Sequence, residues 1–585
     1  MILLGGLSEA ISLGLVVPFL AALASPEKVL SHPWFGLVTS WLEESASFFG
    51  VNFEVSGLTS HRFLLFFGGL FVISALLAGG IRLLLLWASL RLANAAGLDL
   101  AHDAYRRTLH QPLSVHVARN SSSTISSLTT KIPLATLSLS SFLSLLASGV
   151  IALFLVAALL MVSPGTTLGA GVVLGLCYTL ISGVNSGRLA SNSRLISKEQ
   201  DAVFKTLQEG IGGIRDILLD GTQKIYCEAY RKAEMALRRA HASTMFLSYS
   251  PRYFMESLGM VLFAVLALVL CGRSEGLAGA LPVLGALALG VQRLLPVLQQ
   301  GYVSWSSLLA YQEPTREVVD LLEQPMPSWV EEVSNSQIMF EKKVRFDSVG
   351  FRYNPESPKV LSDLSFSIPK GSRVGFVGKT GSGKSTCLDL LMGLLEPTEG
   401  QISIDGKVLN ASNVRAWQRK IAHVPQSIYL TDASLAENIA FGVPPGQIDM
   451  ERVREAARQA QIADFIESSP QGYQALVGER GIRLSGGQRQ RIGIARALYR
   501  QAQVLVLDEA TSALDHQTEV AVAESIRKLG KGITIFTIAH RQSSLEGCDQ
   551  IIDLDQSSSP LASDAQTSKH GTVTPTAQTS EKFVS

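Results

Sequence analysis

Long apolar runs dominate the first half of the chain. Residues 132–187 contain no Asp, Glu, Lys or Arg, and this stretch accommodates two membrane spans because one helical span takes about 20 apolar residues. A Ser-Pro-Gly-Thr turn at 163–166 separates the two. The other candidate spans are residues 2–24, 63–90, 255–271 and 281–309. Such a series is not expected of buried helices in a soluble protein, so we predict six transmembrane helices.

The first apolar run could instead be a signal peptide. No Lys or Arg precedes it and no A-x-A-like cleavage site is clear, which disfavours this alternative. Glu9 is unusual in a span and in a signal peptide alike. Because the run begins almost at residue 1, we expect the natural start to lie upstream.

Basic side chains indicate which loops stay in the cytoplasm. Segments 91–131 and 188–239 are rich in Lys and Arg, whereas the turn at 163–166 has no charge and 272–280 has one Arg and one Glu. Basic loops are retained inside. We therefore predict a multi-pass protein of the cytoplasmic membrane with both termini in the cytoplasm. Residues 25–61 then face outward, with an amphipathic stretch at 41–49 suited to the membrane surface.

Both basic segments are also predicted to be helical. Residues 188–208 and 229–243 have the pattern of helices that continue out of the membrane, and the glycines between them allow turns. A short crossing helix at 219–230, and a similar one at 112–121, would be contact sites for a soluble partner domain.

The composition changes at residues 325–343, where Pro, Ser and acidic residues mark a linker. It separates a transmembrane domain at 1–324 from a soluble domain at 344–556. In the soluble domain, β-rich runs alternate with helical ones, which is typical of a mainly parallel α/β sheet. Strands are predicted at 344–351, 372–377, 421–425, 504–508 and 534–539. The Ser/Thr-rich residues 557–585 are predicted to be a disordered tail.

Charge and cysteine content exclude several classes of protein. The 50 basic and 49 acidic side chains leave a net charge of +1, which gives no support for nucleic-acid binding through bulk charge. Only 17% of residues are charged, against about 25% in soluble domains. The five cysteines form no C-x-x-C pair, which argues against a disulfide scaffold or a zinc ribbon.

Residues 378–385, GKTGSGKS, match the phosphate-binding pattern G-x-x-x-x-G-K-[ST] between an apolar strand and a helical run. The glycines let backbone N–H groups surround a phosphate, and the helix N-terminus adds positive potential. We expect Lys384 to reach the β- and γ-phosphates of ATP and Ser385 to bind Mg²⁺. The alternative, an accidental Gly-rich turn, is disfavoured by the flanking strand and helix. The predicted ATP-binding residues of this loop are Gly378, Lys379, Thr380, Gly381, Ser382, Gly383, Lys384, Ser385 and Thr386.

An acidic pair follows the apolar strand at 504–508. Ligands bind at the carboxyl edge of open α/β sheets, so Asp508 is expected beside the phosphate loop, where it would hold the Mg²⁺ shell. Glu509 is expected to orient or deprotonate the attacking water. Without the phosphate loop, such a pair would as often be a helix cap.

A second anion site is predicted where Leu484, Ser485, Gly486, Gly487 and Gln488 begin a helix. Ser and Gly at a helix start leave backbone N–H groups available, although an ordinary capped helix has the same pattern. One phosphate loop already serves this domain. The second site therefore favours pairing with the nucleotide of another molecule.

With these motifs in this order, residues 344–555 resemble the nucleotide-binding domain of an ABC transporter. The resemblance implies that Tyr353 stacks on adenine and that Gln426 senses both Mg²⁺ and the attacking water. It also implies that His540 contacts the γ-phosphate as a switch. On its own, His540 would be interpreted as an ordinary surface or core histidine.

The same resemblance assigns two further segments. Glu479 matches a loop that contacts the membrane domain, and residues 512–515 match the loop between two ATP sites. The chain departs from the family after Asp553, where the usual glycine-rich strand and closing helix are missing.

The resemblance implies an assembly of two chains. Paired domains would hold each ATP between the phosphate loop of one chain and residues 484–488 of the other. Six spans with one such domain make a half-transporter, so a homodimer is implied. No residue of the set is degenerate, so both sites are expected to hydrolyse ATP. The residues carried over as catalytic are Glu509, His540 and Gln426, and those carried over as Mg²⁺-binding are Ser385, Gln426 and Asp508.

The membrane half resembles six-span exporters and, more closely, bacterial flippases of lipid-linked oligosaccharides. The matching pieces are residues 9–19, which include Val-Pro-Phe, 251–256 (PRYFME) and 291–296 (VQRLLP). This implies ATP-driven translocation of an amphipathic, lipid-linked substrate, with the membrane lipid as a partner. Multidrug and peptide exporters share the architecture and stay open as alternatives. A membrane-anchored regulatory ATPase that transports nothing is a third.

Arg82, Arg252 and Arg293 interrupt apolar stretches. An arginine at a span centre costs about 2.5–3.5 kcal/mol on insertion scales and usually faces a cavity or a partner. Guanidinium groups bind phosphate in a bidentate manner. We hypothesise that these arginines line a cavity for a pyrophosphate-linked polyprenyl glycan. Snorkelling to the interface, or pairing with Glu256, is an equally weighted alternative.

Overall fold

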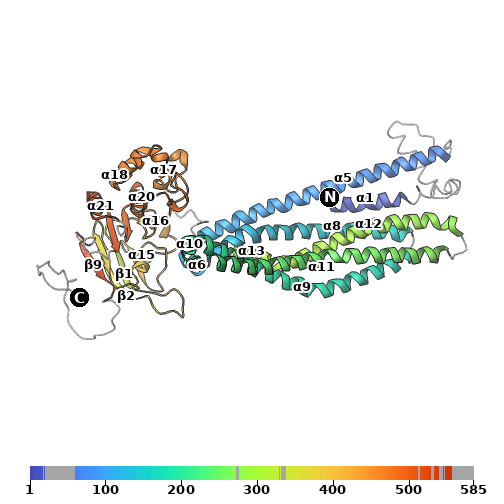
Figure 1. Cartoon of the computed structure of the whole chain (residues 1–585), viewed down its shortest axis with the longest axis horizontal. Helices are drawn as coiled ribbons and strands as arrows, with labels where there is room; N and C mark the ends of the chain where they lie inside the picture. The colour runs from blue at the N-terminus through green and yellow to red at the C-terminus, as the bar shows by residue number, and fades with distance from the viewer. Residues whose placement is uncertain are drawn as a thin grey trace. The chain divides into compact units, whose positions relative to one another are not determined.

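The computed structural model describes residues 1–16, 19, 60–162, 164–271, 276–327, 330, 338–510, 514–528, 532–538, 545 and 547–555. The chain forms two compact units (Figure 1). One comprises residues 1–111 and 115–326, and the other comprises 112–114 and 327–585.

The regular elements of the first unit are all helices within the described residues. Its elements are α1 (Ile2–Gly14), α5 (Ser60–His110), α7 (Ser121–Ser126), the π-helix η2 (Ser127–Lys131), α8 (Ile132–Val162), α9 (Pro164–Gly212), α10 (Ile214–Asp220), α11 (Gln223–Cys271), α12 (Gly276–Ala310) and α13 (Gln312–Leu322). The short helix α6 (Leu113–Ala118) corresponds to the crossing helix predicted at 112–121.

Three helices of the described chain are long and apolar enough to cross a membrane. They are Gly68–His110, Ser121–Met161 and Pro164–Gly212, and α1 is a shorter apolar helix. The predicted spans at 255–271 and 281–309 lie in α11 and α12, which border or include residues without a described environment. The end of the first predicted span and the stretch at 41–49 lie outside the described residues.

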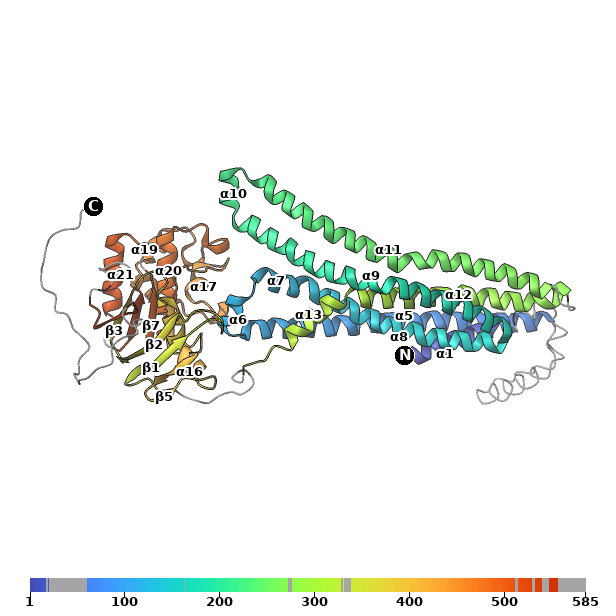
Figure 2. The same ribbon diagram turned by 90° about the horizontal axis from the view of Figure 1, so that it is seen from below.

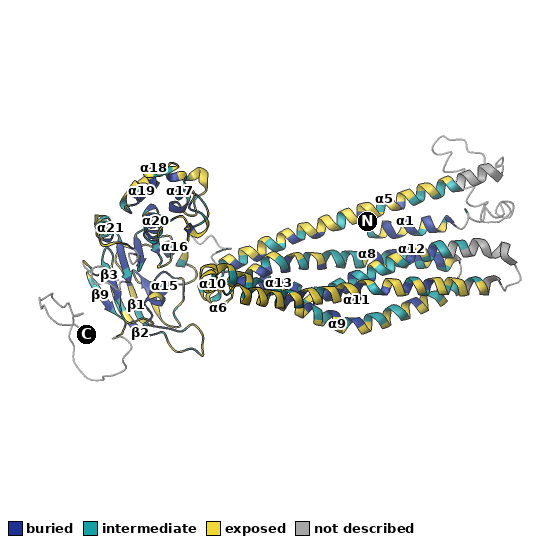
Figure 3. Ribbon diagram, in the orientation of Figure 1, coloured by how far each residue is buried: buried dark blue, intermediate teal, exposed yellow. Residues whose placement is uncertain are grey.

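Apolar side chains cover the outside of these helices. Figure 3 shows exposed residues along α5, α9 and α11, and Leu76, Leu153 and Val184 are among the exposed large apolar side chains. Water would penalise such a surface, whereas lipid would not. The pattern is therefore that of a membrane domain.

Helices α9 and α11 pack side by side as a long hairpin with α10 at its tip (Figure 2). The crossing helix predicted at 219–230 is thus found earlier, at Ile214–Asp220. Glycines set its limits, because Gly221 takes a left-handed φ of 66° that ends the helix. The segment that follows belongs to α11.

A buried lysine ties three elements of this unit together. Lys131, in η2, is fully buried, and its Nζ lies 2.9 Å from an Asp201 oxygen of α9. It also pairs with Glu317 of α13, which accepts a hydrogen bond from Ser197. The cluster links α13 to the helices that precede it in the chain.

The described residues of the second unit form two sheets. The parallel sheet has the order β6-β7-β8-β3-β9, with β6 (Ile421–Val424), β7 (Val504–Asp508), β8 (Thr534–Ile538), β3 (Arg373–Val377) and β9 (Gln550–Asp553). The antiparallel sheet has the order β2-β1-β4-β5, with β2 (Leu361–Pro369), β1 (Lys343–Phe351), β4 (Glu399–Ile404) and β5 (Lys407–Val408). The strand predicted at 344–351 belongs to the antiparallel sheet, so the mainly parallel arrangement applies to the other sheet only.

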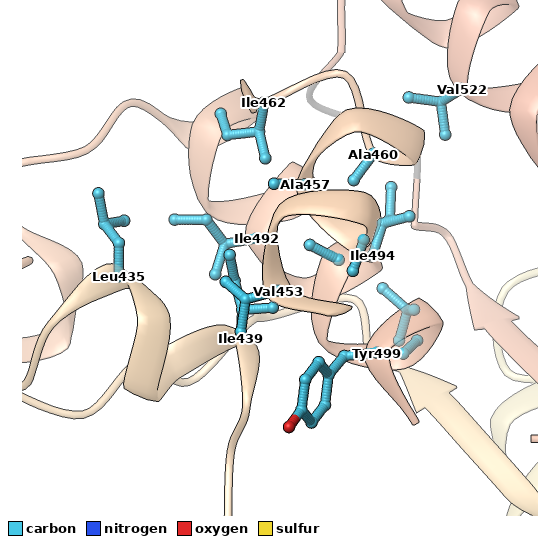
Figure 4. Close-up of a cluster of buried hydrophobic side chains, with 14 of the residues drawn as sticks. Leu435, Ile439, Val453, Ala457, Ala460, Ile462, Ile492, Ile494, Tyr499 and Val522 are labelled. Carbon is cyan, nitrogen blue, oxygen red and sulfur yellow. The ribbon is translucent and has the colours of Figure 1, made fainter. Parts of the chain in front are cut away.

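The described residues of this unit also form several α-helices. They are α15 (Lys384–Leu391), α16 (Val414–Gln418), α17 (Leu435–Ile439), α18 (Met450–Gln459), α19 (Ala463–Ser468), α20 (Gly486–Tyr499) and α21 (His516–Lys528). Figure 4 shows a core in which Ile439, Val453, Ile492 and Val522 come from four of these helices. All four are fully buried, and the same cluster includes Val424 of β6 and Leu507 of β7, so it packs α20 against the sheet.

Candidate functional site

A tight glycine loop joins β3 to α15. Gly378, Gly381 and Gly383 have φ values of 145°, 87° and 90°, which L side chains rarely adopt. A Cβ atom on Gly378 would lie 2.6 Å from the Ser382 hydroxyl. The backbone therefore needs glycine to close around whatever the loop holds.

One ammonium group and one hydroxyl group of the loop are placed to bind an anionic ligand. The Lys384 side chain is buried, and its Nζ donates to the carbonyl oxygens of Gly378 at 2.8 Å and Lys379 at 2.9 Å. The buried Ser382 hydroxyl has no hydrogen-bond partner among the described residues. A phosphate would supply acceptors for both groups, so the loop fits a nucleotide.

Strand β7 brings the acidic pair to the same sheet edge. The loop follows β3, Asp508 ends β7 and Glu509 follows it, and Gln426 lies just after β6. The three strands belong to one parallel sheet. The Gln426 amide donates to a Glu509 carboxylate oxygen at 2.8 Å. Glu509 has a left-handed φ of 49°, a strained conformation for a non-glycine residue that often marks a functional site.

The oxygen atoms near this edge are of the kind Mg²⁺ prefers. Ser385 offers a hydroxyl, Gln426 an amide oxygen and Asp508 a carboxylate, and hard oxygen donors suit this ion. Asp389 of α15 adds a second acidic group. Burial, together with the nearby Asp508 charge, raises the pKa of Asp389 to about 6.

Tyr353 is anchored next to the loop. Its hydroxyl lies 3.2 Å from the Thr386 hydroxyl, and its ring meets Phe351 edge-on at 5.0 Å. The side chain is still partly exposed. A ring held at one edge, with area left open, is suited to stacking on a base.

Residues 484–488 form a capped helix start. Leu484 is buried, and the Ser485 hydroxyl accepts a hydrogen bond from the Gln488 backbone N–H. The Gln488 side chain accepts from the Ser485 backbone N–H at 2.8 Å. This capping box fixes the first turn of α20 while Ser485 stays exposed.

Other predicted site residues are only partly described. His540 and residues 511–513 lie outside the described residues. Glu479 begins a 3-10 turn at Glu479–Gly481. Asp515 accepts hydrogen bonds from the backbone and hydroxyl of Thr518 at the start of α21.

Two of the three arginines that interrupt apolar stretches share one carboxylate. Glu9 of α1 is fully buried and pairs with Arg82 of α5 and with Arg293 of α12, the latter at 3.0 Å. Arg293 also donates to Ser12. Arg252 instead pairs with Glu256, one turn along α11, at 2.7 Å. The structure thus joins Arg82 and Arg293, and gives Arg252 a carboxylate of its own.

Comparison with known families accounts for both units. The profile of the ABC transporter family matches residues 361–512, and that of the ABC transporter transmembrane region matches residues 16–292. The chain belongs to the ABC transporter family. It is an exporter-type half-transporter, with one transmembrane domain and one ATP-binding domain.

Relatives of this ABC transporter include flippases. It is 34% identical over 384 residues to the ATP-dependent lipid A-core flippase of Chromohalobacter salexigens. The aligned region covers 64% of each chain. It is 34% identical to the heterocyst differentiation ATP-binding protein HepA of Nostoc sp., over 60% of this chain and 56% of that one. These matches span less than two thirds of either relative's length.

A solved structure resembles the whole ABC transporter chain. It is a bacterial Atm1-family ABC exporter with ATP bound, 25% identical, with a TM-score of 0.72. The similarity covers 94% of this chain and 93% of that one.

Three charged groups of this ABC transporter were not predicted to have roles. Asp389 lies in the helix after the phosphate loop. Its position one turn into that helix is the sequence feature that could have indicated a place near the nucleotide. Glu9 was noted only as unusual in an apolar run. The cluster around Lys131 joins residues up to 186 positions apart, which leaves no local pattern to find.

Proposed function

We propose that two copies of this ABC transporter form a homodimer that hydrolyses ATP to move an amphipathic lipid across the cytoplasmic membrane. One observation carries the proposal. The glycine loop, Asp508 and the Gln426–Glu509 pair lie at one edge of a parallel sheet, in a chain that also has helices suited to span a membrane.

The roles of the site residues follow from their chemistry. Lys384 would release the loop carbonyls and bind the β- and γ-phosphates, and the loop N–H groups would hold the remaining phosphate oxygens. Mg²⁺, held by Ser385, Gln426 and Asp508, would neutralise phosphate charge. Tyr353 would stack on the adenine.

Glu509 would act on the attacking water. Its carboxylate is held by the Gln426 amide, so the base and the residue that senses the phosphates would move together. Acceptance of a proton by Glu509 would make the water nucleophilic. His540 would contact the γ-phosphate.

The second chain would complete each site. Ser485, Gly486 and Gly487 at the start of α20 would offer the helix N-terminus to the γ-phosphate held by the partner's loop. ATP binding would then close the two domains. The short helices α6 and α10 would pass this movement to the spans.

The lipid substrate is proposed from two observations. Several relatives are named lipid A-core flippases, and Arg82 and Arg293 supply two guanidinium groups to one buried carboxylate. This leaves an excess positive charge suited to a lipid phosphate. A pyrophosphate-linked glycan is the finer version of this proposal, and both termini would be cytoplasmic.

Reconstitution tests the function. The purified chain in liposomes should move a fluorescent lipid-linked oligosaccharide in an ATP-dependent manner, and Glu509→Gln should abolish the movement. ATP hydrolysis without movement of any lipid or dye would favour a membrane-anchored regulatory ATPase. Export of a dye or a peptide with no lipid movement would favour a multidrug or peptide exporter.

A further inference from the structure

Strand β9 brings the chain back to the phosphate loop. It runs parallel to β3 at one end of the described parallel sheet, with Asp553 opposite Val377. The Leu554 backbone N–H donates to the Val377 carbonyl at 3.1 Å, so the pairing continues one residue beyond β9. Since the glycine loop begins at Gly378, directly after β3, the residue that follows Leu554 emerges beside this loop.

That residue, Asp555, holds a backbone group of the loop. The Lys379 N–H donates to the two Asp555 carboxylate oxygens at 3.0 and 3.2 Å. Asp555 is itself fixed, because its backbone N–H donates to the Asp553 carboxylate at 3.0 Å. An ionised carboxylate is a stronger acceptor than a neutral group. The contact joins residues 176 positions apart and ties the end of β9 to the start of the loop.

Lys379 is thus held on both of its backbone polar groups. Asp555 accepts from its N–H, while the Lys384 ammonium donates to its carbonyl oxygen and to that of Gly378. When Lys384 moves to the phosphates, as the proposed function requires, both carbonyl contacts are lost. The Asp555 contact does not involve Lys384. Among the hydrogen bonds of the described residues, it is then the side-chain restraint left on this turn.

The contribution of Asp555 is its hydrogen bond rather than its charge. A carboxylate beside a phosphate site repels the nucleotide. Asp555 is exposed, so water and salt weaken this repulsion. Its net charge therefore brings no advantage to the site, whereas its acceptor oxygens keep the Lys379 N–H in place.

We propose that Asp555 is a positioning residue of the ATP site. It holds the Gly378–Lys379 turn in the shape that accepts phosphate while Lys384 leaves the loop carbonyls for the nucleotide. The inference rests on the proposed function, in which this loop holds ATP. It extends the nucleotide site to the end of β9, a segment to which neither the sequence motifs nor the loop itself assigned a role.

Three substitutions in the full chain test the role. Asp555→Ala removes the acceptor, and Asp555→Asn keeps one acceptor oxygen but no charge. Asp464→Ala removes an exposed aspartate from α19 and is the matched control. Each purified variant is placed in phosphatidylcholine nanodiscs. The measurements are kcat and KM for ATP, displacement of TNP-ATP by ADP, hydrogen exchange of the loop with ADP and Mg²⁺, and the melting temperature.

Asp555→Ala should raise the KM for ATP and the Kd for ADP about two- to tenfold, which is the range of one net hydrogen bond. Its kcat should stay within about twofold, because Asp555 does not contact the reacting atoms. With ADP bound, exchange should be faster in residues 378–386 and unchanged in α18 and α20. Asp555→Asn and Asp464→Ala should resemble the wild type in each measurement.

Four results would overturn the inference. They are an unchanged KM and Kd in Asp555→Ala, a fall in kcat alone, a loss as large in Asp555→Asn as in Asp555→Ala, and a lower melting temperature with faster exchange throughout the domain. The last of these would mean that Asp555 only stabilises the fold.

Lys384→Ala separates this inference from the proposed function. If Lys384→Ala binds ADP as tightly as the wild type, the assignment of the loop to the nucleotide fails. If Lys384→Ala weakens ADP binding and Asp555→Ala does not, the nucleotide site stands and only the role of Asp555 is lost.

Discussion

The Gln426 side-chain amide donates a hydrogen bond of 2.8 Å to the Glu509 carboxylate. The two residues follow different strands, β6 and β7, and meet at the carboxyl edge of the parallel sheet. A carboxylate held in this way can orient a water molecule while it is itself oriented by a residue next to the phosphates. This contact connects the residue predicted to sense Mg²⁺ and the attacking water with the proposed base.

Glu509→Gln should separate ATP binding from hydrolysis. The substitution keeps the size of the side chain but removes its ability to take up a proton, so turnover should fall about 10²–10⁴-fold. ATP affinity, measured with the fluorescent nucleotide TNP-ATP, should stay within about twofold. Glu451→Gln, on exposed α18, is the matched control. Unimpaired turnover in Glu509→Gln would remove Glu509 from the mechanism.

Lys131→Met should weaken the helical unit. It leaves the carboxylates of Asp201 and Glu317 without their shared cation, which should cost about 1–3 kcal/mol. Lys205→Met removes an exposed partner of Glu209 and should cost about 0–0.5 kcal/mol. The melting temperatures of both variants in detergent provide the comparison. Equal melting temperatures would mean that the buried cluster adds nothing to stability.

Glu9→Gln should disturb the membrane core more than the matching change at Glu256. Glu9 is buried between two arginines, and its neutralisation leaves both cations without a counter-charge. Glu256 and Arg252 are an exposed pair on one helix, and the loss of this contact leaves only one cation without its partner. We expect a lower melting temperature in detergent for Glu9→Gln only. The opposite order would indicate that Glu9 is not the centre of the cluster.

Acidic pH should destabilise the ATP-binding unit through His423. Burial on β6 lowers the pKa of this imidazole below its usual value of 6.5. Below about pH 6.5 the unfolded chain therefore binds a proton that the folded chain does not, and stability is lost as the pH falls. The melting temperature of His423→Gln, measured relative to that of the wild type, should therefore be higher at pH 5.5 than at pH 7.5. A constant difference in melting temperature at both pH values would contradict this.

Local patterns predicted the parts of the fold that depend on neighbouring residues. The strand before Gly378, the helix after Lys384 and the strand ending at Asp508 were all placed from short runs. The antiparallel strands β2 and β4 were missed: β2 pairs with β1 across a short connection, and β4 pairs with β1 across the intervening strands β2 and β3 and helix α15. A short amphipathic run does not reveal its partner.

Contacts between distant residues could not be predicted in the same way. Arg293 and Glu9 are 284 positions apart, so the sequence indicated that each was unusual but not that they pair. The residues that the family resemblance assigns to the nucleotide lie mostly in short sequence motifs, which made them predictable as candidates. The α10 helix was displaced from its predicted place because glycines at 213 and 221 decide where it begins and ends.

The central claim is that each ATP site is shared by two chains, and mixed dimers test it most directly. Lys384→Ala damages the phosphate loop, and Ser485→Arg blocks the start of α20. Each variant alone should lose ATP hydrolysis. If the site is shared, dimers purified through two different tags on the two variants hold one intact site out of two, and should recover about half of the wild-type rate. If both parts of a site come from the same chain, the mixed dimer has no intact site, and a rate no higher than that of either variant alone would contradict the account.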